Sequence, residues 1–208
     1  MSTVDFSDVA APDIRAFHDA ELARDGGAAA QFAESAGVWP WIEANHRCNR
    51  LLWDEEDRAR RRDVADAAIV ANKRAIDGYN QKRNDAIERI DEALLMRLAG
   101  VVPTPDAWHN SETAGSMIDR LSILALKIFH MRAETERTDA TPAHVATCTE
   151  KLERLALQRA DLGRCLDTLL ARAASGTAFW RVYRQFKMYN DPTLNPYLYR
   201  SAPSGSEP

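Results

Sequence analysis

The chain has 208 residues, 45% hydrophobic and 28% charged, which is the composition of a globular protein long enough to bury one core. Its formal net charge of −4 argues against a general nucleic-acid-binding protein, which would carry an excess of Lys and Arg. The three cysteines lie far apart, which fits reduced thiols in the cytoplasm better than a disulfide framework or a zinc site. With no secretion signal after Met1 and no apolar run near the roughly 18 residues of a membrane span, we expect a cytoplasmic protein.

The two ends of the chain differ in composition from the middle. Residues 1–10 and the Ser-, Pro- and Gly-rich residues 201–208 are predicted to be disordered, which leaves one domain over residues 11–200. Pro12 suits the first position of a short helix, and Gly26–Gly27 suits its end.

Two helices are predicted in the first half of the domain. One starts near Trp39–Trp41 and runs through the 50s. A much longer one extends from about Asp63 to Leu98, because apolar residues such as Ile76 and Ile90 recur at helical spacing. The pattern leaves open whether the two helices join without a break.

Three more helices are predicted after a proline-containing loop at Val101–Asn110. Ser111 is the expected N-cap of a helix that is apolar on nearly all sides as far as Phe129, and this helix should be central and buried. Another starts near Pro142 and ends at Ser175–Gly176, and a last short one covers Ala178–Tyr189.

No segment alternates apolar and polar residues as a strand does, so we predict none. Long helices with mostly short connections imply antiparallel neighbours. The predicted fold is therefore all-α: a single-domain antiparallel helical bundle of four or more long helices with short flanking helices.

A polar face runs along the longest predicted helix. It is rich in Asn and Asp, which weaken helix interiors, so the short polar groups serve either a ligand site or a buried hydrogen-bond network. The residues at steps of three or four are Lys73, Asp77, Asn80, Asn84, Glu88 and Asp91, with Gln81 and Asp85 beside them.

The predicted central helix carries charges in an apolar context. Asp119, Arg120 and Lys127 must be paired if they are buried. One alternative is pairing of Asp119 and Arg120 with charges on the longest helix. The other is an anion site, in which Arg120 supplies a fork of donors and Lys127 a point charge.

The start of this helix is a second candidate anion site. Ser111, Glu112 and Ser116 belong to a run of small and hydroxyl residues whose free N–H groups would face an anion. The run lacks P-loop spacing, and simple helix capping is the alternative explanation.

Acid–base and metal chemistry have weaker support. His46 is a candidate general base, with Glu88 or Asp85 as a second proton-transfer group. The pattern Glu43-x-x-His46 has the spacing of di-iron bundles but occurs only once, and the acid cluster Asp54–Asp57 lacks the motif of helical Mg²⁺-dependent pyrophosphohydrolases. A metal-dependent hydrolase is thus an alternative without an assigned metal ligand, and the cofactor is unknown.

The C-terminal segment contains two Asx-Pro units that form an irregular turn. It either docks the C-terminus on the bundle or folds over the polar faces, bringing Lys187 and Asn190 into a site.

Several blocks of the sequence resemble an uncharacterised bacterial family, domain of unknown function 4254. The resemblance runs from about Trp39 to Tyr199 and is carried in order by Trp41–His46, Leu52–Asp57, Lys73–Asp77, Asn80–Asp85, Ser111–Ser116, Ile118–Leu124 and Lys187–Pro192. It implies an association with gene clusters for cell-surface carbohydrate assembly, and it implies no particular reaction.

Two functions follow from these features. The first is an enzyme or enzyme subunit acting on an anionic metabolite, a sugar phosphate or a nucleotide sugar, with Lys73, Arg120 and Lys127 on the anion. The second is a non-catalytic module that binds a protein partner such as a glycosyltransferase, or another copy of itself, because the chain has five tryptophans.

Overall fold

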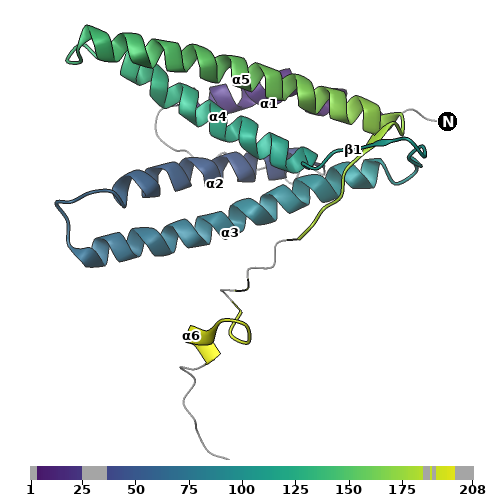
Figure 1. Ribbon diagram of the computed structural model, residues 1–208, viewed down its shortest axis with the longest axis horizontal. Helices are drawn as coiled ribbons and strands as arrows, with labels where there is room; N and C mark the ends of the chain where they lie inside the picture. Colours follow the sequence, from purple (N-terminus) through teal and green to yellow (C-terminus); the bar gives the residue numbers. More distant parts are fainter. Residues whose placement is uncertain (1–3, 25–36, 185–187, 189–190, 200–208) are drawn as a thin grey trace, which may run out of the picture.

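The computed structural model describes residues 4–24, 37–184, 188 and 191–199. Four long helices dominate it (Figure 1): α2 Trp39–Arg58, α3 Asp66–Arg97, α4 Ala114–Thr135 and α5 Pro142–Ala174. The shorter elements are a 3-10 helix Ser7–Val9, α1 Ala11–Ala23, β1 Trp108–His109, β2 Ala178–Phe179 and α6 Pro196–Tyr199. The predicted helical composition is confirmed. None of the described helices is both long and apolar enough to cross a membrane.

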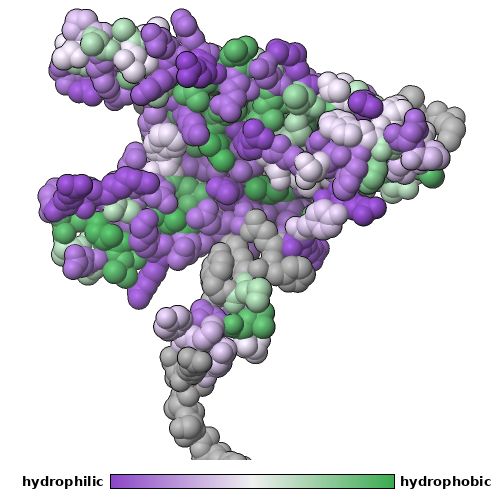
Figure 2. All heavy atoms as spheres, viewed as in Figure 1, coloured by the Kyte–Doolittle hydropathy of each residue, from purple (hydrophilic) through white to green (hydrophobic). Residues whose placement is uncertain are grey.

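The long helices form two hairpins, α2 with α3 and α4 with α5, and α1 lies against α4 and α5. Contacts between the hairpins are fewer than those within them, and run from α4 to α2 and α3. At the ends farthest from β1 the hairpins diverge, and Figure 2 shows a notch between them with hydrophobic side chains inside it. A break at residues 59–65 separates α2 from α3, which answers the question that the sequence left open.

Helix α4 is the central helix, as predicted. Ile118 and Leu121 have no exposed surface, and they belong to a core shared with α1, α2, α3 and α5. The helix starts later than expected, because its N-cap is Thr113, whose Oγ1 accepts a hydrogen bond from the Ser116 N–H at 3.1 Å. Ser111, the predicted cap, is exposed in the loop before it.

Three expectations about the shorter segments differ from the structure. Two strands of two residues each pair in parallel, Trp108 with Ala178 and His109 with Phe179, and such strands are too short to show an alternating pattern. Residues 178–184 therefore contain this strand and no helix, while residues 185–187 and 189–190 of the predicted last helix lie outside the described residues.

The third difference is at the N-terminus, where order was not expected. Phe6 and Val9 are buried in the core, and the Arg97 guanidinium lies 4.8 Å from the centre of the Phe6 ring. Arg97 also forms an ion pair with Asp8 at 2.6 Å. Two buried apolar side chains and one cation thus hold a segment whose own composition indicated disorder. The predicted disordered tail, residues 201–208, lies outside the described residues.

Candidate functional site

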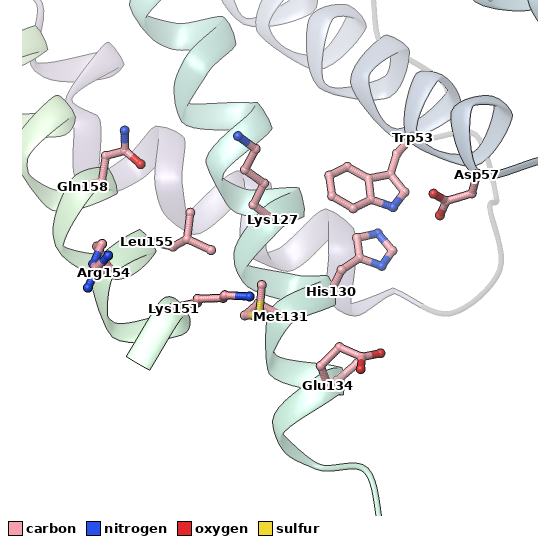
Figure 3. A pocket seen from close by; sticks show the side chains of 11 residues that line it. Trp53, Asp57, Lys127, His130, Met131, Glu134, Lys151, Arg154, Leu155 and Gln158 are labelled. Carbon is pink, nitrogen blue, oxygen red and sulfur yellow. The ribbon is translucent and has the colours of Figure 1, made fainter. Parts of the chain in front are cut away.

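The notch between the two hairpins contains a cavity of about 660 Å³ that is open to solvent (Figure 3). Helices α2, α4 and α5 each contribute to its wall. The lining side chains are Trp53 and Asp57 from α2, Lys127, His130, Met131, Ala133 and Glu134 from α4, and Lys151, Arg154, Leu155 and Gln158 from α5. Ligand sites are typically of this size, with a mostly apolar wall and a few polar groups.

An aromatic stack forms one side of the cavity. The rings of Trp53 and His130 lie 4.4 Å apart, with only 2° between their planes, and Phe129 meets His130 edge-on at 5.4 Å. Trp53 comes from one hairpin and His130 from the other. The stack therefore connects the hairpins where they begin to diverge, and it presents flat aromatic surface to the cavity.

Three cations line the cavity, Lys127, Lys151 and Arg154, and all three are exposed. Among the described residues, no ion pair involves any of them. Their positive charge is therefore available to a ligand. Lys127 is the one residue of the predicted anion site that the structure places here.

The acids of the cavity do not neutralise these cations. Glu134 forms ion pairs at 3.0 Å with Arg137 and His144, and their hydrogen bonds hold the pKa of its carboxyl below the usual range. Asp57 lies beside Trp53, on the side of the cavity away from Lys151 and Arg154 (Figure 3).

A buried polar network joins α2 to α4, away from the notch cavity. Asp119 Oδ1 accepts hydrogen bonds from the side-chain amides of Asn45 at 2.8 Å and Asn49 at 2.9 Å. The Asn49 amide also donates to Ser122 Oγ at 3.0 Å, and Arg83 Nε on α3 lies 3.6 Å from Asp119 Oδ1. Of the two alternatives for Asp119, the structure supports pairing within the protein, in part with a cation on the longest helix.

His46 belongs to the same network. Its Nδ1 lies 2.8 Å from Ser122 Oγ, and its ring stacks on that of His18 at 4.5 Å. Burial lowers the pKa of His46 to about 3 and also lowers the pKa of His18, so both rings are neutral at pH 7. His46, the predicted general base, is 1% exposed and does not line the notch cavity.

The N-terminus of α4 is occupied by protein groups. The Gly115 N–H donates to Asp91 Oδ1 at 2.8 Å, and the next N–H is taken by the Thr113 cap. A Cβ at position 115 would lie 2.6 Å from the Ile87 carbonyl oxygen, so glycine is what allows α3 to approach this closely. The Asp91 carboxylate thus stands where the sequence suggested a bound anion, and burial raises its pKa to about 6.

The polar face of α3 divides between this junction and the surface. Asn84 and Glu88 line a small cavity of about 100 Å³ with Asp91, Thr113 and Ser116. Four predicted residues nearer the α2–α3 turn, Lys73, Asp77, Gln81 and Asp85, are exposed, and Asn80 is half-buried. Lys73 lies 3.6 Å from Glu56, and the Gln81 amide donates to Asp85 at 2.7 Å.

Arg120 lies on yet another face. It is exposed and makes two hydrogen bonds to Glu112, at 2.7 and 2.9 Å, beside a cavity of about 350 Å³. Its partner comes from the preceding loop and not from the longest helix, contrary to the pairing alternative. Gln158 lines both this cavity and the notch. Lys187 and Asn190 lie outside the described residues.

The sequence reasoning missed most of the notch. His130, Lys151 and Arg154 form no motif, because the residues that line the cavity come from three helices. The spacing of Asn45 and Asn49, four residues apart on one helix, is a signal that could have revealed the buried network. Within the described ranges, no group of three or more His, Cys, Asp or Glu side chains is placed to hold a metal ion.

The model of a family described as "Protein of unknown function (DUF4254)" matches residues 39–182. The chain belongs to this family. Neither a curated protein nor a solved structure matches the chain. The matched range of the DUF4254 family contains all four long helices, so the notch, the buried network and the α3–α4 junction all fall inside it.

Proposed function

We propose that this DUF4254 protein binds an anionic metabolite, a sugar phosphate or a nucleotide sugar, in the notch between its helical hairpins, as an enzyme or as the subunit of one. The observation that carries the proposal is a set of three cations around a cavity of about 660 Å³, Lys127, Lys151 and Arg154, none of which forms an ion pair with another described residue. Unpaired cations on an apolar wall are suited to phosphate, because charge-assisted hydrogen bonds strengthen where water is partly excluded.

The notch replaces the polar face of α3 as the site of this function. Lys127 keeps its predicted role as an anion ligand, and Lys151 and Arg154 replace Lys73 and Arg120 as the other two cations. His130 is the imidazole that a ligand in this cavity would reach, since His46 is enclosed between helices. A cytoplasmic role in bacterial cell-surface carbohydrate assembly would supply ligands of this class.

Isothermal titration calorimetry with inorganic pyrophosphate and with a hexose 1-phosphate tests the proposal. The wild-type protein should bind both, and Lys127→Ala combined with Arg154→Ala should weaken binding by at least about tenfold, because each hydrogen bond to a charged group contributes about 1.5–3 kcal/mol. Lys82→Ala is the matched control, since Lys82 is an exposed lysine outside the notch.

Two results would contradict the proposal. One is wild-type protein that binds neither anion at millimolar concentration. The other is equal weakening by Lys82→Ala and by the notch substitutions, which would mean that overall charge and not the notch attracts the anion.

The second candidate function is an interaction module, and exposed apolar side chains favour it. Phe129, in edge-on contact with His130, is 42% exposed, and Leu157 on α5 is 61% exposed. A contiguous exposed apolar patch on a folded protein commonly marks a binding site for another chain, and Phe129 and Leu157 are the side chains through which such a patch would act. Copurification of one stable partner, lost on Phe129→Ser and Leu157→Ser, together with no binding of either anion, would favour this function over the first.

A further inference from the structure

The aromatic stack in the notch has no role in binding phosphate, and it suggests what else the ligand carries. Trp53 and His130 are half-buried and line the cavity, and their nearly parallel rings stack face to face, so that a further flat ring can extend the stack on an outer face. Flat aromatic side chains bind nucleic-acid bases by stacking, and they do so for every base because each base has a π-face.

The aromatic and the cationic side chains lie on different sides of the cavity, as the base and the phosphates of a nucleotide would require. Trp53, His130 and Asp57 lie together on one side, Lys151 and Arg154 lie on the other, and Lys127 lies between them (Figure 3). A phosphate group alone would leave the aromatic side of the cavity facing water. A ligand with a base at one end and phosphates at the other covers both sides.

Asp57 sets the direction in which such a ligand binds. Its carboxylate repels phosphate from the aromatic side, and it can accept hydrogen bonds from the N–H and amino groups of a base. The base of a bound nucleotide would therefore lie near Asp57 and Trp53, and its phosphates near Lys151 and Arg154.

We infer that the ligand of the notch is a nucleoside diphosphate or a sugar ester of one, whose base stacks on the Trp53–His130 pair while its phosphates bind Lys127, Lys151 and Arg154. This inference rests on the proposed anion site and narrows its ligand to the class that carries a base.

Calorimetric titrations with ADP, UDP and inorganic pyrophosphate test it on the full-length protein. On the wild type, ADP or UDP should bind about 5- to 150-fold more tightly than pyrophosphate, which is the effect of stacking one base. Trp53→Ala should remove this advantage and leave the affinity for pyrophosphate unchanged, whereas Trp53→Phe should keep part of it. Trp41→Ala is the matched control, because Trp41 is an exposed tryptophan of α2 outside the notch.

The outcomes separate this inference from the function on which it rests. Equal affinity for pyrophosphate, ADP and UDP on the wild type overturns the inference and leaves the anion site in place, and this comparison needs no variant to fold. A Trp53→Ala protein that weakens all three ligands equally shows that the stack is structural, which also overturns the inference. If none of the three binds, the proposed function fails as well.

Discussion

Asp119 is the group on which the buried network between α2 and α4 converges, so replacing it tests whether that network stabilises the fold. Asp119→Ala removes the acceptor of two amide donors, Asn45 at 2.8 Å and Asn49 at 2.9 Å. The Asn49 amide keeps its hydrogen bond to Ser122, so the free-energy cost of losing its bond to Asp119 is small. The Arg83 side chain is 28% exposed and can form hydrogen bonds with water instead. With about 1–3 kcal/mol for each buried donor left without an acceptor, the expected loss is about 2–4 kcal/mol of unfolding free energy.

Urea unfolding followed by far-UV circular dichroism measures this loss, which is a large part of the ~5–15 kcal/mol that stabilises a typical domain. Asp119→Asn keeps an acceptor oxygen and should lose about 1 kcal/mol or less. Asp77→Ala, at an exposed position of α3, is the matched control and should change stability by no more than about 0.5 kcal/mol. If Asp119→Ala loses less stability than Asp119→Asn, or no more than the control, the hydrogen bonds from Asn45 and Asn49 to Asp119 do not stabilise the fold.

Three further predictions concern the α3–α4 junction and the N-terminus. Gly115→Ala should lower the unfolding free energy by about 1–3 kcal/mol in the same assay, because its Cβ would lie 2.6 Å from a backbone oxygen. Gly78→Ala, in a helical backbone with open space around it, should instead raise the unfolding free energy by about 0.5–1 kcal/mol. Equal effects of the two substitutions would refute the close approach of α3 to Gly115. Burial raises the pKa of Asp91 from 3.8 to about 6, so the folded protein binds the proton of the Asp91 carboxyl more tightly than the unfolded chain does. Protonated Asp91 therefore stabilises the fold at low pH, and this stabilisation is lost as the pH rises from about 4 to about 6. The unfolding free energy of the wild type minus that of Asp91→Asn should therefore fall by about 2 kcal/mol over this range. The opposite contribution of His18 and His46 cancels in this comparison, and a flat difference would contradict the raised pKa. Phe6→Ala should cost about 3 kcal/mol because Phe6 is in the core, and an unchanged thermal midpoint would mean that residues 4–10 do not stabilise the domain.

The helices themselves could be predicted from the sequence because their signals are local. Pro142 and Ser175–Gly176 mark the two ends of α5, and an apolar run without a polar face identifies α4 as the central helix. The polar residues inside helices were also recognisable, since Asn and Asp are costly there unless something compensates them. These are properties of neighbouring residues on one helix, and they depend on the chain only over a few turns.

Which polar residues meet was decided by the tertiary structure alone. Asp119 and Arg120 are adjacent in sequence, yet one is buried against α2 and the other is paired at the surface, because neighbouring positions on a helix point about 100° apart. The notch combines Trp53, Lys127 and Arg154 from three helices, and no spacing within one segment encodes how far two hairpins diverge. The sequence by itself therefore determined the helices and the residues that need partners. The contacts between helices determined which partner each residue found, and which cations of the described part of the chain form no ion pair.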